Sequence, residues 1–288
     1  MILCCAVSVH AQNFYDSFIA SQNVEIIQGK VPAYFTPTNE DIARELQHTV
    51  TKAVDYYEAL TKSDFRVKLA VLDSVQWPHE RVPFGYVFYS SGWIFMNTGM
   101  SYDNFKKIYG LEDLYMQMDQ ELAHAGITSA EMISSFYEVY AIHELGHYFI
   151  SQISNARSPD KWTNEFIATY FAFNFFMDDD ESALTAFELF HRVHMNLYQP
   201  VHATIEDFNS IYMRMGVENY LWYHSNFYFL VEALYDCYGP KFLFEYEQKF
   251  PKQSDDQHST AQIIQWLDRG CNEAVASWVN ALESRTKN

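Results

Sequence analysis

The sequence predicts an α+β protein with strands near its start and helices from about residue 112 onward. Short segments rich in β-branched and alternating residues occur only before residue 100, whereas apolar residues at helical spacing dominate afterwards. Strands that precede helices, rather than alternating with them, are typical of α+β folds. With 288 residues, 49% of them hydrophobic, the chain can bury a sizeable core.

Three segments of the first part predict strands, over residues 23–30, 65–73 and 86–99. The last one reads as two short strands, because Ser90, Ser91 and Gly92 interrupt it. Residues 38–62 carry apolar side chains at helical spacing, with Thr38 or Asn39 as the cap.

Thr128 and Glu131 have the spacing of a capping box and predict a helix that runs to about Ile153. The residues that follow, 154–160, break the helical pattern and mark the junction between two lobes. Further helices are predicted over residues 161–177, 182–197, 217–238, 259–268 and 271–284. The predicted lobes are an N-terminal α+β lobe over residues 12–158 and a helical C-terminal lobe over residues 159–288.

The first eleven residues, MILCCAVSVHA, are typical of the end of a signal peptide cut after Ala11, although a buried first strand is the alternative. A lipid anchor is disfavoured because the residue before Cys5 is not small. A cut at this point predicts an exported protein, periplasmic or extracellular. Cys237 and Cys271 would remain and could pair there, or stay as two buried free thiols.

Charge and hydropathy exclude two classes of partner. The chain has 37 acidic and 19 basic residues, a formal net charge of −18, and no cluster of Lys and Arg. We therefore expect no nucleic-acid partner, and a local basic patch on an acidic chain is the alternative. No apolar run reaches the roughly 18 residues that a membrane span requires. The sequence leaves the oligomeric state open.

The segment YEVYAIHELGHYFISQI, residues 137–153, carries two histidines four positions apart. Side chains at this spacing are neighbours on a helix, so His143 and His147 can bind one zinc ion. Glu144 lies beside this pair, where it can act as a general base without being a ligand. A later helix offers Glu165 as the third ligand, with 17 residues between it and His147.

The segment SPDKWTNEFIATYFAF resembles the third-ligand helix of gluzincin metallopeptidases, the group of thermolysin-like and aminopeptidase-like enzymes, which reads Pro-x-Trp-x-x-Glu-Gly-x-Ala-x-Tyr. The matching residues are Pro159, Trp162, Glu165, Ala168 and Tyr170. Phe166 replaces the glycine of that pattern, and no Asp stands four residues after Glu165. The motif lacks the glycine and third histidine with which metzincins continue.

The resemblance implies a zincin-like two-lobed fold and one Zn²⁺ per chain, held by His143, His147 and Glu165. It also implies a mixed sheet beside the motif helix, with an edge strand that holds an extended peptide. Residues 92–99, GWIFMNTG, are expected to be that edge strand, and a plain core strand is the alternative. In gluzincins a Tyr or His on a later helix stabilises the oxyanion, and here Tyr223 and His224 both match that position.

The expected function is that of an exported zinc peptidase, which hydrolyses peptide bonds with a zinc-activated water and Glu144 as general base. Its partner would be a peptide or protein substrate. The first alternative is a zinc-containing protein of gluzincin fold that binds peptides or glycans without cleaving them. In the second, the helices are a scaffold for assembly and the motif is accidental.

Two weaker motifs are interpreted as structural. His191 and His194 are three apart and could bind a metal, but we expect them to be satisfied surface or core residues. The acidic residues before Ser182 could bind Ca²⁺. They lack the ligand spacing of an EF-hand and precede a predicted helix, whose dipole favours negative charge at that end.

Overall fold

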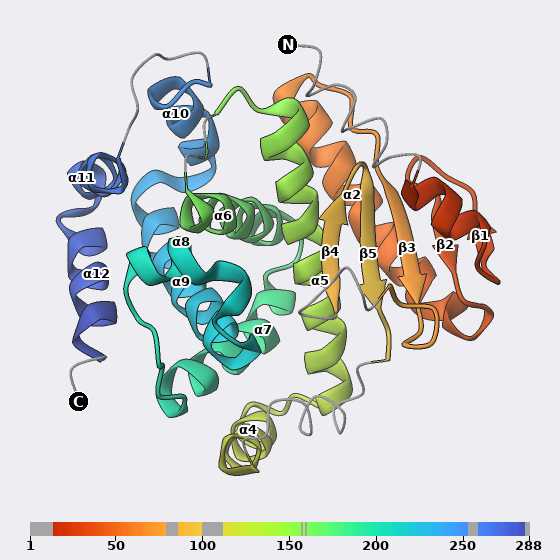
Figure 1. Cartoon of the computed structure of the whole chain (residues 1–288), viewed down its shortest axis with the longest axis horizontal. Helices are drawn as coiled ribbons and strands as arrows, with labels where there is room; N and C mark the ends of the chain where they lie inside the picture. The colour runs from red at the N-terminus through yellow and green to blue at the C-terminus, as the bar shows by residue number, and fades with distance from the viewer. Residues whose placement is uncertain are drawn as a thin grey trace.

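The computed structural model describes residues 14–78, 86–99, 112–156, 158, 160–252 and 259–285. These residues form an α+β structure with one mixed sheet and many helices, as the sequence predicts (Figure 1). The strands are β1 (Glu25–Ile27), β2 (Ala33–Phe35), β3 (Lys68–Leu72), β4 (Val87–Ser90) and β5 (Trp93–Asn97). Among the described helices, none is long and apolar enough to cross a membrane.

The described strands lie in the order β1-β2-β3-β5-β4. Strands β2, β3 and β5 are parallel, whereas β1 and β4 pair antiparallel at the two edges. The prediction that residues 92–99 form the edge strand is therefore wrong, since β5 pairs on both sides and β4 is the edge. The cause is a tight hairpin, in which Ser91 and Gly92 have φ of 52° and 83° and turn β4 back along β5.

Helices cover both faces of the sheet. Leu69 and Val71 of β3 belong to the main core, which includes buried residues of α2 (Glu40–Thr61) and α5 (Ser129–Tyr148). Ala70 points to the other face, where it joins a smaller cluster with Tyr15 of the helical residues 14–20. This alternation is that expected of a strand between two layers.

The remaining helices follow the predicted order. They are α4 (Glu112–Ala125), η2 (Phe149–Ile153), α6 (Lys161–Asp179), α7 (Glu181–Leu197), α8 (Ile205–Ile211), α9 (Val217–Tyr238), α10 (Phe242–Lys249), α11 (Thr260–Cys271) and α12 (Ala274–Ser284). The short helices α8 and α10 were not predicted. The predicted capping box of Thr128 and Glu131 starts α5, and Asp180 caps α7 through a hydrogen bond from the Ser182 N–H. The acidic run therefore lies at the start of a helix, as predicted.

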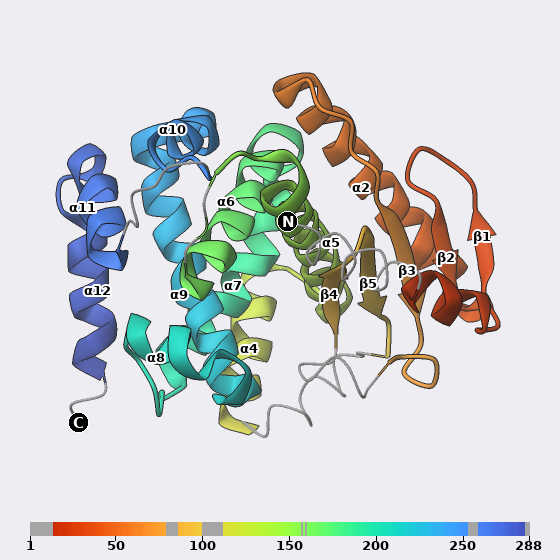
Figure 2. The ribbon, with the colours of Figure 1, turned by 45° about the horizontal axis from the view of Figure 1, so that its top comes forward.

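Helix α5 lies between the sheet and the helices of the C-terminal part (Figures 1 and 2). Its contact with α6 is close because Gly146 has no side chain. A Cβ at Gly146 would lie 2.9 Å from the Cα and 3.0 Å from the carbonyl oxygen of Ala168. This glycine therefore allows α6 to approach the face of α5 that carries the two histidines.

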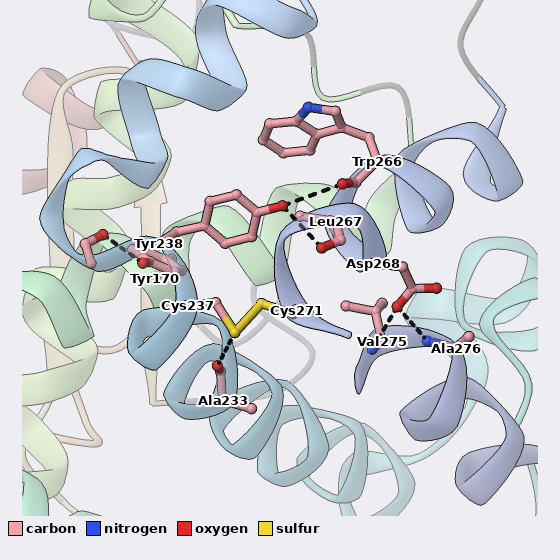
Figure 3. The surroundings of a disulfide bond; sticks show 11 residues. Tyr170, Ala233, Cys237, Tyr238, Trp266, Leu267, Asp268, Cys271, Val275 and Ala276 are labelled. Carbon is pink, nitrogen blue, oxygen red and sulfur yellow. Dashed lines mark hydrogen bonds between the residues drawn. A yellow bond between two sulfur atoms is a disulfide. The ribbon is translucent and has the colours of Figure 1, made fainter. Parts of the chain in front are cut away.

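A disulfide fastens the last two helices to α9 (Figure 3). It joins Cys237, near the end of α9, to Cys271 at the end of α11, with the Cα atoms 5.6 Å apart. Nearby, the Tyr238 hydroxyl donates to the carbonyl oxygens of Trp266 and Leu267, at 3.2 and 2.9 Å. Of the two alternatives for these cysteines, the structure has the paired one.

Candidate metal centre

The two histidines of α5 meet Glu165 of α6 in the interior. Glu165 Oε2 lies 3.1 Å from His143 Nε2 and 3.4 Å from His147 Nε2. The side chains of His143 and Glu165 are 4% exposed, whereas that of His147 is 14% exposed. The structure thus brings together the three ligands that the sequence predicts, across the close crossing at Gly146.

These distances suit a zinc ion. Ligands at about 2.0–2.1 Å from a tetrahedral Zn²⁺ are about 3.3–3.4 Å from one another. The separations of Glu165 Oε2 from the two imidazole nitrogens lie close to this value. Two imidazoles and one carboxylate are also a donor set that catalytic zinc sites use, so the residues present fit the ion.

The second nitrogen of each histidine has a polar neighbour. His143 Nδ1 lies 3.3 Å from Thr169 Oγ1, and His147 Nδ1 lies 3.2 Å from the side-chain amide of Asn164. Such contacts fix the orientation of a ligating ring. Thr169 stands four residues after Glu165, where thermolysin-like members carry Asp, so this position still contacts a histidine. Pro159 of the matching pattern lies outside the described residues.

Tyr212 holds the other oxygen of the third ligand. Its hydroxyl donates a hydrogen bond to Glu165 Oε1 at 2.6 Å, which leaves Oε2 to face the histidines. Burial, and then the charge of Glu165, raise the pKa of Tyr212, so the hydroxyl keeps its proton. No motif in the sequence points to Tyr212, because it lies in a 3-10 turn, η3 (Tyr212–Arg214), 47 residues after Glu165.

Glu144 lies beside the histidines and faces the edge strand. Its carboxylate is buried and accepts a hydrogen bond from the backbone N–H of Tyr89 in β4. Burial raises the pKa of Glu144, although the two histidines oppose this effect. A carboxylate with a raised pKa is better matched to proton transfer near neutral pH.

Without a metal, His147 and Glu165 form an ion pair. Burial acts against the charge of His147, but the carboxylates of Glu165 and Glu144 outweigh it and raise the pKa of His147 to about 9. Burial likewise acts against the charge of Glu165, yet the neighbouring histidines bring its pKa well below the usual range. A concentration of negative charge at this point is what a bound cation requires.

Of the two residues predicted to stabilise the oxyanion, only His224 lies at the site. Its Nε2 is 3.5 Å from Glu165 Oε2, and burial lowers its pKa to about 3, so the ring is neutral. Tyr223, the preceding residue of α9, points elsewhere and donates a hydrogen bond to the Thr204 carbonyl oxygen at 2.7 Å.

A small cavity lies behind the ligands. Its volume of about 10 Å³ is the least that holds one water molecule. Among its lining atoms, Tyr140 Oη and His191 Nε2 are buried and lack a hydrogen-bond partner, whereas His191 Nδ1 lies 2.8 Å from Ser225 Oγ. A water molecule there would satisfy these buried polar atoms.

The histidine pair of α7 lies in the core. His191 and His194 are both buried, and neither ring nitrogen of His194 has a hydrogen-bond partner. The core is one of the two predicted alternatives, and within it His191 makes one hydrogen bond, through Nδ1, whereas His194 makes none. In the part of the chain that the structure describes, each group of side chains that could hold a metal includes His143.

Comparison with protein-family models, curated proteins and solved structures gives no match for this chain. The resemblance to gluzincins therefore rests on the motif residues and on their geometry.

Proposed function

We propose that this chain is a zinc-dependent peptidase of gluzincin type, with a zincin-like two-lobed fold. Its zinc ligands are His143, His147 and Glu165. The observation that carries the proposal is the position of Glu165 Oε2, within 3.4 Å of the Nε2 atoms of both histidines of the motif. The three side chains come from two helices that cross in the interior, so their convergence is a property of the fold.

The chemistry follows from the groups around the site. A bound zinc ion would polarise the scissile carbonyl and lower the pKa of water toward about 7. Glu144 takes a proton from the attacking water and delivers it to the leaving amine. His224 is the group on α9 that can donate to the developing oxyanion, and such a donor contributes about 3–4 kcal/mol to the barrier reduction.

The edge strand β4 supports a peptide as the substrate. Tyr86 O accepts a hydrogen bond from Asn97 N of β5. Backbone groups of an antiparallel strand point alternately to its two sides. Val87 and Tyr89 therefore direct theirs away from β5, toward the side of Glu144, whose carboxylate already accepts from the Tyr89 N–H. An extended peptide can add to this edge by β-augmentation, with its backbone beside the candidate base.

Access is greatest on the side of His147. This ligand is the most exposed of the three, and the neighbouring Asn164 lines a polar pocket of about 400 Å³. The pocket also includes Lys161 and Asn209. We assign it to substrate residues that extend beyond the scissile bond. Export remains part of the proposal, and the disulfide is compatible with an oxidising compartment.

The test is cleavage of a diverse peptide library by the zinc-loaded protein, followed by mass spectrometry. Glu144→Gln should abolish cleavage while zinc still binds. Glu138→Gln is the matched control, because Glu138 lies on the same helix but contacts Thr49 instead of the metal ligands. Cleavage that survives in Glu144→Gln would contradict the assignment of the base. An untouched library with zinc bound would favour the non-cleaving binding protein.

A further inference from the structure

The Nε2 atom of His224 lies where a further zinc ligand could lie. Its Nε2 is buried, lacks a hydrogen-bond partner, and lies 3.5 Å from Glu165 Oε2. Glu165 Oε2 thus has three imidazole nitrogens around it, those of His143, His147 and His224, at 3.1, 3.4 and 3.5 Å. All three distances lie near the edge length of about 3.3–3.4 Å of a tetrahedral zinc site.

His224 also forms a group with two of the other ligands, His143 and Glu165. Ligand atoms of His143, Glu165 and His224 all lie within 4.8 Å of one another, and all three residues are buried. Two ligands of a tetrahedral zinc ion are about 3.3–3.4 Å apart. The imidazole of His224 therefore needs to move by no more than about 1.5 Å to share an ion with the other two.

Among the described residues, no side chain or backbone group forms a hydrogen bond with His224 Nε2. The ring packs against Tyr220, with centroids 4.3 Å apart, and lies 6.0 Å from the ring of Phe227. Aromatic neighbours such as these restrict the ring, while its Nε2 is directed at Glu165. A buried nitrogen without a partner costs free energy, and coordination removes that cost.

We propose that His224 is a fourth protein ligand of the zinc ion in the resting protein. The inference rests on the proposed function, because it concerns the same ion. Three protein ligands leave a position for water, whereas four close the site. The resting protein would then be latent, and an entering substrate has to displace the His224 ring.

Zinc X-ray absorption spectroscopy tests the proposal, because it counts imidazole ligands directly. We expect three imidazoles in the wild-type protein and two in His224→Gln. The matched control is His194→Gln, which removes another buried histidine and should keep three. Competition with a chelator should show that His224→Gln binds zinc at least tenfold more weakly, since changes outside the ligand shell already cost 10–100-fold.

Each outcome has a separate meaning. Two imidazoles in the wild-type protein, with zinc affinity unchanged in His224→Gln, would overturn the fourth ligand and leave the proposed peptidase intact. Failure of the wild-type protein to bind zinc would refute the proposed function itself. The count in the wild-type protein decides the question even where a variant does not fold, and thermal unfolding of the metal-free variants shows whether each one does.

Discussion

Removing the hydroxyl of Tyr212 should weaken zinc binding while the fold is kept. In Tyr212→Phe, Glu165 Oε1 loses a hydrogen bond of 2.6 Å. The aromatic ring stays, so its packing against Phe208, at a centroid distance of 5.3 Å, is unchanged. The carboxylate can then rotate, and Oε2 is no longer held toward the histidines.

The size of the effect follows from the charge of the acceptor. A hydrogen bond to an ionised group is worth about 1.5–3 kcal/mol. A tenfold change in affinity corresponds to about 1.4 kcal/mol. Tyr212→Phe should therefore bind zinc about 10–100-fold more weakly, which is also the range found when groups that orient metal ligands are removed.

The assay is zinc affinity by competition with a chelator at constant pH. Tyr223→Phe is the matched control, because it also removes a buried phenol hydroxyl, one that donates to the Thr204 carbonyl oxygen at 2.7 Å. The control should lose stability but keep its zinc affinity. Equal zinc affinities of Tyr212→Phe and the wild-type protein, or equal losses in both variants, would refute the assigned role of Tyr212.

Three further predictions concern stability. Gly146→Ala should lower the free energy of unfolding by up to about 2 kcal/mol and weaken zinc binding. The clash of the new methyl group with the Ala168 backbone costs about 1–3 kcal/mol, and the gain in helix propensity returns about 1 kcal/mol. Urea denaturation measures the stability and chelator competition the zinc affinity, and a more stable variant with full affinity would contradict the prediction. Burial lowers the pKa of His194 to about 4. Between pH 6.5 and 4 the unfolded chain therefore binds a proton that the folded protein does not, and the free energy of unfolding decreases as the pH is lowered. In His194→Phe, up to about 3 kcal/mol of this loss of stability in acid should disappear. The difference in Tm between pH 7 and pH 4 should therefore be smaller than in the wild-type protein, and an equal difference would contradict the prediction. Replacing Cys237 and Cys271 by Ser should lower the free energy of unfolding by about 4 kcal/mol, given their separation of 34 residues, and equal urea midpoints for the variant and the wild-type protein would exclude this.

Local spacing made much of the candidate site predictable. Residues four apart on one helix must be neighbours, so the motif alone places His143 and His147 together. The capping box at Thr128 predicts where that helix starts, and the resemblance of the next helix points to Glu165. Each of these inferences depends on contacts within one helix or on a pattern within one segment.

The sequence could not separate Tyr223 from His224. Adjacent residues on a helix point about 100° apart, since 3.6 residues make one turn. Which of them faces Glu165 therefore depends on the rotation of α9 against α5 and α6, which only the packed core determines. Tyr212 was missed for a related reason, because a hydrogen bond across 47 residues leaves no periodic signal in the sequence.

The order of the strands in the sheet could likewise not be predicted from the sequence alone. Residues 93–97 are buried along their whole length, and such a run is compatible with several places in a sheet. Alone, the sequence determined the order of most helices and strands and the placement of His143, Glu144 and His147 on one helix. The tertiary structure decided which strand is the edge, which cysteines pair, and which side chains surround Glu165, because these depend on contacts between segments that local propensity does not encode.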